Sequence, residues 1–253
     1  MATAVVGAGR PASDLPLHAA GHHDTDGRSV LDRVISSYTP TIRALSHVRG
    51  RRHTGERAVR PRRLVVSMPH TPDAADLPGA RDEAGLLPGA TILTGSEATR
   101  DRVDAALHEA TWAHFACHAQ SRFDDPSSSF LLLHDHQDNP FDVRHLSTLR
   151  LPHAELAYLS ACSTSQPGPQ LIDEAVHISA AFQLAGFPHV IGTLWAIKDR
   201  AAPKMAQAIY TDLLHGPADD RDIAGVVHRA AHRMRQAYPR LPLMWAAHLH
   251  VGL

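Results

Sequence analysis

The chain has 253 residues, enough to bury a full hydrophobic core as one large domain or two smaller ones. Hydrophobic residues make up 43% and charged residues 20%, and the formal net charge is −1. This is the composition of an ordinary globular protein, and the near-zero charge argues against a nucleic-acid-binding surface. No apolar run reaches the length of a membrane span and the N-terminus lacks a signal-peptide pattern, so we expect no membrane association.

Cysteine and histidine counts bear on the compartment and on metal binding. Two cysteines, Cys117 and Cys162, are too few for a disulfide-stapled secreted fold, so we expect a reducing compartment, the cytoplasm. A single disulfide between the two stays open. Histidine is frequent, with 20 residues, but the clusters at 18–23 and 134–138 lack the paired spacing of a zinc site. We interpret them as polar surface and predict no metal or other cofactor.

Strands and helices alternate along the chain once the N-terminus is passed. Residues 1–13 are small and contain glycine and proline, which predicts a disordered tail. We expect strands at residues 34–38, 62–68, 90–95, 111–117, 130–135, 155–161, 188–195 and 245–252. We expect helices beginning at Pro40 and at residues 79–87, 96–110, 172–186, 200–215 and 219–237.

This alternation predicts an α/β fold with a mostly parallel sheet and helices on both faces. The continuous apolar strands at 90–95 and 188–195 fit burial on both faces of such a sheet. Helix boundaries carry their own signals. Ser96 or Thr99 can cap the start of the third expected helix, and Gly186 stands at the C-cap of the fourth.

A histidine and a cysteine each follow a predicted strand. His118 comes directly after strand 111–117, and Cys162 directly after strand 155–161. In an open parallel sheet, ligands bind beyond the carboxyl ends of the strands. A histidine near a thiol favours the thiolate and activates it as a nucleophile, and a small neighbour such as Ala119 lets a substrate approach the backbone. On the residues alone, a buried and inert cysteine is an equally good interpretation.

Three segments resemble a known family. "HFACHAQ", "LSACSTS" and "IDEAVHISAAFQLAGFPHVIGTLWAIKD" are similar to the CHAT domain, a caspase-like family of clan CD cysteine peptidases related to separase. That family has the motifs H-x-A-x-H-G, L-S-A-C-x-T, A-F-x-x-A-G and V-x-x-x-L-W-x-V-x-D in this order. The resemblance covers about residues 14–253 and implies a caspase-like fold for this domain. The family's domain usually begins with an apolar strand, which residues 1–13 do not supply, so the first strand could be missing.

The resemblance implies a role for individual residues. His118 becomes the catalytic base and Cys162 the nucleophile of an endopeptidase that acts on protein or peptide substrates through an acyl-enzyme. Oxyanion donors are implied at the backbone N–H groups of Cys162 and Ala119. Asp199 matches the last aspartate of the separase-type L-W-D-V-T-D stretch, near the pocket for a basic P1 side chain, although it can equally cap the helix that begins near residue 200. Asp173, at the start of its helix, is a further candidate for lining the cleft.

Other positions are not assigned a catalytic role. Strand alternation predicts that His114 is a packed strand residue and that Cys117 belongs to the core. Ala119 replaces the glycine of the family's H-G motif, and glycine permits backbone angles that alanine resists. This departure motivates a second hypothesis, in which the chain is a degenerate CHAT domain that binds a protein without cleaving it. A regulatory protein partner is a further expectation.

Overall fold

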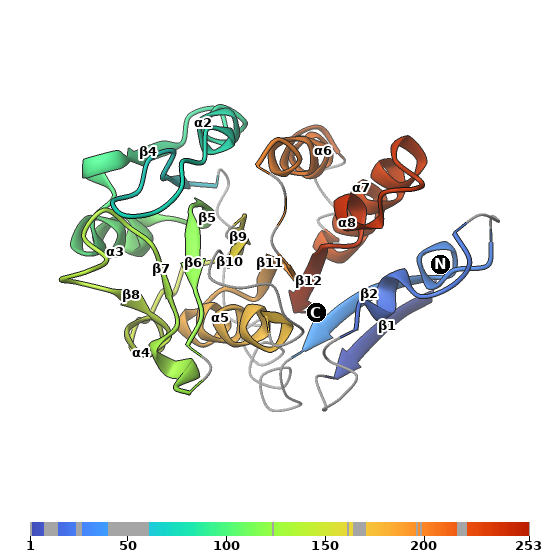
Figure 1. The fold of residues 1–253 in the computed structure, drawn as a ribbon, viewed down its shortest axis with the longest axis horizontal. Coiled ribbons are helices and arrows are strands. Elements are labelled where there is room, and N and C mark those ends of the chain that lie inside the picture. The colour runs from blue at the N-terminus through green and yellow to red at the C-terminus, as the bar shows by residue number, and fades with distance from the viewer. Residues whose placement is uncertain are drawn as a thin grey trace.

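The structure is a computed structural model that describes residues 2–7, 15–23, 27–39, 61–122, 124–160, 162–163, 171–195, 197, 199–216 and 222–252. Its centre is an eight-stranded sheet in the order β1-β2-β12-β11-β9-β5-β3-β4 (Figure 1). These strands are, in the same order, Ala2–Gly7, Val34–Thr39, His248–Gly252, His189–Thr193, Leu156–Leu159, Trp112–Ala116, Arg63–Ser67 and Thr91–Thr94. Every neighbouring pair is parallel except β11 and β12. The predicted α/β fold with a mostly parallel sheet is therefore confirmed.

Helices cover both faces of this sheet, as predicted (Figure 1). One face carries α2, α6 and α7, and the other carries α3, α4 and α5. Their bounds are Gly79–Ala84, Ala202–His215, Ile223–Ala237, Arg100–Glu109, Val143–Leu146 and Leu171–Ala185. A short helix, α8 (Pro242–Trp245), precedes β12. Because side chains alternate along a strand, β3 sends Leu64 and Val66 into one core and Val65 into the other.

The N-terminal segment differs from the expected tail. Residues Ala2–Gly7 form β1, which pairs in parallel with β2 along its whole length. The strand that could have been missing is thus present at the edge of the sheet. Thr3, Ala4 and Val5 are exposed, so no alternation of buried and exposed side chains marks these positions in the sequence. Pairing with β2 places the segment in the sheet. The helix expected from Pro40 lies outside the described residues.

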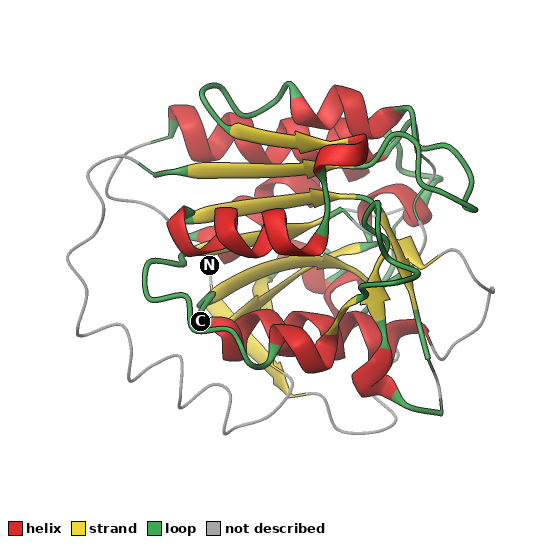
Figure 2. Ribbon diagram, turned by 90° about the vertical axis from the view of Figure 1, so that its left-hand side faces the viewer, coloured by secondary structure: helices red, strands yellow, loops and turns green. Residues whose placement is uncertain are grey.

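A second, four-stranded sheet stands at the carboxyl ends of the central strands (Figure 2). Its order is β10-β6-β7-β8, with bounds Cys162–Ser163, His118–Gln120, Phe130–Leu131 and Phe141–Asp142. The strand expected at residues 130–135 is therefore only two residues long and belongs to this sheet, not to the central one. Leu131 and Leu133 of its apolar run are buried in the core that α3, α4 and α5 also line.

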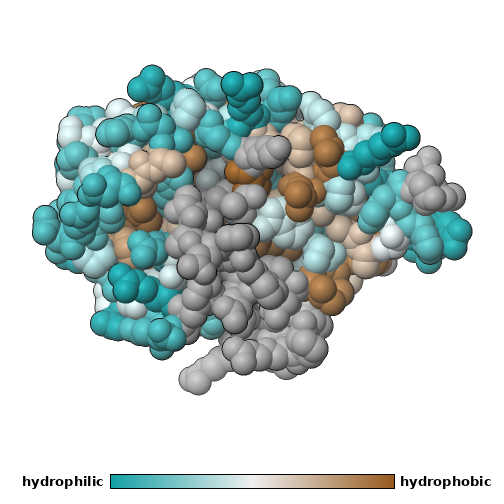
Figure 3. All heavy atoms as spheres, viewed as in Figure 1, coloured by the Kyte–Doolittle hydropathy of each residue, from teal (hydrophilic) through white to brown (hydrophobic). Residues whose placement is uncertain are grey.

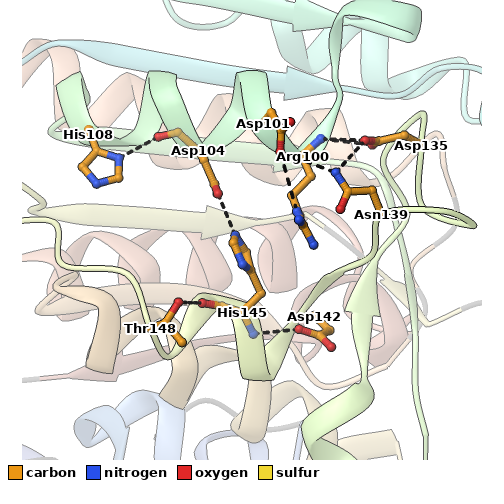
Figure 4. Close-up of polar contacts among 9 residues, drawn as sticks. All are labelled: Arg100, Asp101, Asp104, His108, Asp135, Asn139, Asp142, His145 and Thr148. Carbon is orange, nitrogen blue, oxygen red and sulfur yellow. Dashed lines mark hydrogen bonds and ion pairs between the residues drawn. The ribbon is translucent and has the colours of Figure 1, made fainter.

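Polar contacts join α3 to α4 and to the loop before β8 (Figure 4). His145 Nε2 lies 2.7 Å from Asp104 Oδ2, with both side chains about one-fifth exposed. The Asp142 carboxylate accepts from the backbone N–H of His145 at 2.7 Å and caps α4. At the start of α3, Asp135 accepts from the backbone N–H of Arg100 at 3.0 Å. These contacts fix the helices that flank the small sheet.

The surface is mainly hydrophilic, with apolar residues in separate groups on the face drawn in Figure 3. Large apolar side chains that are exposed come from distant parts of the chain: Val5, Leu15, Ile92, Leu184, Leu241 and Leu243. Scattered residues of this kind are normal for a globular surface. They do not by themselves define a docking patch.

Candidate active site

His118 and Cys162 occupy neighbouring positions on two strands. β5 ends at Ala116, and the chain bends at Cys117 before β6 begins with His118. In the same way β9 ends at Leu159 and β10 begins with Cys162. β6 and β10 are parallel, and Cys162 pairs directly with His118. Because adjacent strands lie about 4.8 Å apart, the two backbones are neighbours at the carboxyl edge of the central sheet (Figure 2). The catalytic roles of the two residues stay predictions.

The imidazole of His118 is held by a backbone carbonyl. The side chain is buried, and its Nε2 lies 2.7 Å from the carbonyl oxygen of Ala75. A carbonyl only accepts hydrogen bonds, so Nε2 carries the proton and donates it to this bond. The neutral ring then has its lone pair on Nδ1. The His118 backbone is fixed as well, since its carbonyl accepts from Leu132 N at 2.8 Å.

Ala119 lies inside the small sheet and is not strained. It pairs with Ser163 on β10 and with Leu131 on β7. Among the described residues other than glycine, Asp73 alone has a positive φ. Alanine is therefore compatible with the backbone at position 119, although the family motif has glycine there. The predicted oxyanion role of its N–H group stays a prediction.

Asp199 is bonded to a helix far away in the sequence. Both carboxylate oxygens lie 3.0 Å from the backbone nitrogen of Gly79, at the start of α2. The alternative that Asp199 caps the helix following it is wrong, because α6 has Ala201 at its N-cap and no side-chain cap bond. The carboxylate accepts a hydrogen bond from the first turn of α2 instead. Asp199 is only partly buried, so this contact leaves its predicted role in substrate binding open.

A small cavity adjoins the His118 strand. Its lining residues come from β6, β7, β9, α5 and β11: Ala119, Leu131, Leu159, Ile178, Ser179, Gly192 and Thr193. The Ser179 hydroxyl is buried and has no hydrogen-bond partner among the described residues. Asp173, the further cleft candidate, lies in the first turn of α5, and its side chain is outside the described part of the structure. Its role stays a prediction.

His114 belongs to a buried polar cluster that the sequence did not predict. The predictions that His114 is packed and Cys117 is core are confirmed, as both are 0% exposed. His114 Nδ1 shares a 2.6 Å hydrogen bond with the hydroxyl of Tyr210 on α6. Its Nε2 lies 3.1 Å from Glu83 Oε2 on α2, an ion-pair distance without the alignment of a hydrogen bond. Burial raises the pKa of Tyr210 well above its ordinary value, so the phenol stays protonated. A buried histidine in a strand needs hydrogen-bond partners, but no local sequence pattern predicts which residues supply them.

Metal-binding clusters and membrane-spanning helices are two further features that bear on function. Within the described ranges, no three side chains of His, Cys, Asp or Glu gather in a way that could hold a metal ion. The helices described there also fall short of the length and hydrophobicity that a bilayer crossing requires.

The family model of the CHAT domain matches residues 5–253. The chain belongs to the CHAT domain family. The resemblance of the separate motifs thus extends over nearly the whole sequence. Tetratricopeptide repeat protein 28 of Mus musculus is 29% identical to this CHAT domain, over 60% of the chain and 8% of the relative. The chain therefore spans less than a tenth of that relative's length.

Solved structures show the same fold as this CHAT domain. The Arg-specific cysteine proteinase gingipain R superposes with a TM-score of 0.62 at 13% identity, covering 92% of this chain and 56% of gingipain. Separase from Saccharomyces cerevisiae, in its complex with securin, gives a TM-score of 0.61 at 14% identity, covering 95% of this chain and 15% of that chain. At these identities the likeness establishes the caspase-like fold and not the activity.

Proposed function

We propose that this CHAT domain is a cysteine endopeptidase with Cys162 as the nucleophile and His118 as the general base. The observation that carries the proposal is the direct pairing of Cys162 with His118 on parallel strands. Paired residues on adjacent strands present their side chains to the same face of a sheet. This is the arrangement that a thiol–imidazole dyad needs.

The tautomer of His118 suits this chemistry. With Nε2–H donating to the carbonyl of Ala75, the lone pair on Nδ1 can take the proton of the Cys162 thiol. The thiolate sulfur then bonds to the scissile carbonyl carbon, and Nδ1–H gives its proton to the leaving amine as the C–N bond breaks. Water, deprotonated by His118, finally attacks the thioester and releases the thiolate. The Ala75 carbonyl keeps the ring oriented through these steps.

The oxyanion of the tetrahedral intermediate needs backbone donors. The N–H groups of Cys162 and Ala119 are our candidates, because the two residues lie on neighbouring paired strands, one register position apart. Alanine is compatible with this role at position 119, because its φ is not positive and its backbone is unstrained.

A basic P1 side chain is the preferred substrate feature in this proposal. Asp199 offers a partly exposed carboxylate, which would pair with a guanidinium or ammonium group. Asp173 would add negative charge to the same cleft. The fold neighbour gingipain R is an Arg-specific proteinase, which agrees with such a preference. A regulatory protein partner also belongs to the proposal, since the separase neighbour is in complex with securin.

A panel of fluorogenic peptides with Arg, Lys, Asp or Leu at P1 tests the proposal. We expect the wild type and Cys117→Ala to cleave Arg and Lys peptides, and Cys162→Ala and His118→Ala to have no activity. Cys117→Ala is the matched control because it removes the other thiol, which is buried in the core. Equal turnover by the wild type and Cys162→Ala would refute the peptidase assignment.

A protein-binding module without activity is the second candidate. It is favoured by Ala119, which replaces the glycine of the family motif and is paired on both sides within the small sheet. Alkylation by iodoacetamide separates the two functions. A working dyad should label Cys162 much faster than buried Cys117, whereas slow and equal labelling would support the binding module.

A further inference from the structure

The loop at residues 68–78, here called the histidine-holding loop, is fixed at both ends. It connects β3 to α2, and its ends are joined by a 2.9 Å bond from the Ser67 hydroxyl to the carbonyl of Ala80. Within the loop, Leu77 N donates to the Pro69 carbonyl at 2.9 Å. These bonds close the loop into one compact unit, so a displacement at its end moves its middle.

The middle of this loop holds the candidate catalytic base. The carbonyl of Ala75 accepts the 2.7 Å hydrogen bond from His118 Nε2. Because that bond fixes both the tautomer and the orientation of the imidazole, the loop determines where Nδ1 is presented. A small shift of the Ala75 carbonyl would therefore change the direction in which Nδ1 points.

Asp199 fixes the end of the same loop. Its two carboxylate oxygens lie 3.0 Å from Gly79 N, four residues beyond Ala75. The approach is close enough to need glycine. A Cβ added at position 79 would lie 2.6 Å from the Asp199 carbonyl oxygen and 2.7 Å from its Oδ1.

The far end of α2 is anchored separately. Glu83 lies 3.1 Å from the imidazole of His114, which is bonded to Tyr210, and all three side chains are buried. Loss of the Asp199 contact would therefore leave α2 in place on the sheet. It would remove one of the two contacts that hold the first turn, the other being the Ser67 bond to Ala80, and would let that turn and the histidine-holding loop in front of it shift.

We infer that Asp199 is a positioning residue for His118, acting through Gly79 and the histidine-holding loop. The inference rests on the proposed dyad of His118 and Cys162. The inference also couples the binding of a basic P1 side chain to the orientation of the catalytic base. A carboxylate has about four acceptor sites, and Gly79 supplies only one donor. A basic side chain bound to the remaining sites would act on the element that orients the catalytic base, so recognition and activation share one residue.

Labelling kinetics of the full chain test this inference. Neutral iodoacetamide would be reacted between pH 5 and 10, with the rates at Cys162 and Cys117 resolved by peptide mass spectrometry. For Asp199→Ala we expect the Cys162 rate at pH 7 to fall about tenfold and the midpoint of its pH profile to move up toward about 8.5, the value of a free thiol. Asp199→Asn keeps an oxygen for Gly79 N–H and should recover most of this loss. The matched control is Asp82→Asn, an exposed carboxylate on α2.

A second variant breaks the same contact without changing charge. Gly79→Ala leaves Asp199 intact but displaces it, and it should reproduce the shifted pH profile. A Gly79→Ala variant that keeps the wild-type labelling rate and midpoint at Cys162 would overturn the inference.

The outcomes separate this inference from the proposed function. If the wild type labels Cys162 no faster than Cys117, the dyad itself is refuted. If the wild type labels Cys162 fast and Asp199→Ala does so with the same rate and midpoint, the positioning role alone is refuted. Faster labelling of buried Cys117 in Asp199→Ala would show that Asp199 maintains the fold in general, and would also overturn it.

Discussion

Two buried histidines should make the fold unstable in mild acid. His18 shares a 2.8 Å hydrogen bond with the Tyr38 hydroxyl, and its Nε2 lies 3.0 Å from the carbonyl of Ala246. His248 Nε2 lies 3.1 Å from the Tyr158 hydroxyl, and its Nδ1 is buried with no hydrogen-bond partner in the described part of the chain. Burial lowers the pKa of His18 to about 4 and that of His248 to about 3.

The direction and size of the effect follow from these values. In the unfolded chain both imidazoles bind a proton near pH 6.5, whereas the folded protein keeps them neutral down to about pH 4 and pH 3. The unfolded state thus binds more protons in this window, and stability falls as the pH falls below about 6.5. Between pH 6.5 and 5, each histidine should cost roughly 2 kcal/mol, from about 1.4 kcal/mol per pH unit.

Urea unfolding at pH 7.5 and pH 5.0 measures this loss. The double variant His18→Gln/His248→Gln should lose roughly 4 kcal/mol less than the wild type between the two pH values, because neither glutamine titrates. His153→Gln, an exposed position, is the control and should keep the wild-type dependence. The reasoning is refuted if the double variant and the wild type lose the same free energy of unfolding.

Three further predictions concern stability, measured by urea unfolding at pH 7.5. Gly186→Ala should cost more than about 1 kcal/mol, because Gly186 has φ +142°, while Gly85→Ala, at φ −75°, should be nearly neutral. Phe182→Ala should cost about 3 to 5 kcal/mol, because this ring is 0% exposed and its loss leaves a cavity. Asp104→Ala and His145→Ala should couple by about 1 kcal/mol in a double-mutant cycle, since the pair is mostly buried.

Each of these has an outcome that contradicts it. Equal effects of alanine at positions 85 and 186 would show that φ does not decide the cost of the substitution. A loss below about 1 kcal/mol for Phe182→Ala would mean that α5 collapses into the space. Additive losses at Asp104 and His145 would show that their 2.7 Å contact contributes nothing to the folded state (Figure 4).

The sequence predicted the elements that bury continuous apolar faces. The strands that became β3, β4, β5, β9 and β11 and the helices that became α3, α5, α6 and α7 were expected close to their observed bounds. Their patterns are local, because most apolar side chains in them face a core on one side or the other. β4 is the exception: it stands at the edge of the sheet and Ile92 is 43% exposed, so the burial expected on both faces of strand 90–95 is wrong. The strands at the opposite edge and in the small sheet were harder to predict. β1 is exposed over Thr3–Val5, and β10 has two residues, so pairing partners far along the chain define both.

The candidate site was likewise predictable only where a local sequence pattern marks it. Motifs identified His118 and Cys162 as positions, but their direct pairing depends on the register of β6 and β10, which are 44 positions apart. The partners of Asp199 and His118 were not predictable for a similar reason. Gly79 and Ala75 act through backbone groups, and any residue has those, so no side-chain pattern marks them.

The single antiparallel step of the central sheet has a practical consequence. Since β12 runs against β11, His248 pairs with Thr193 at the edge near the small sheet, and Gly252 pairs with His189 at the opposite edge. A tether, tag or fused reporter attached behind β12 would therefore leave from the rim remote from Cys162. Immobilised through that end, the protein would still present its cysteine edge to macromolecules in solution.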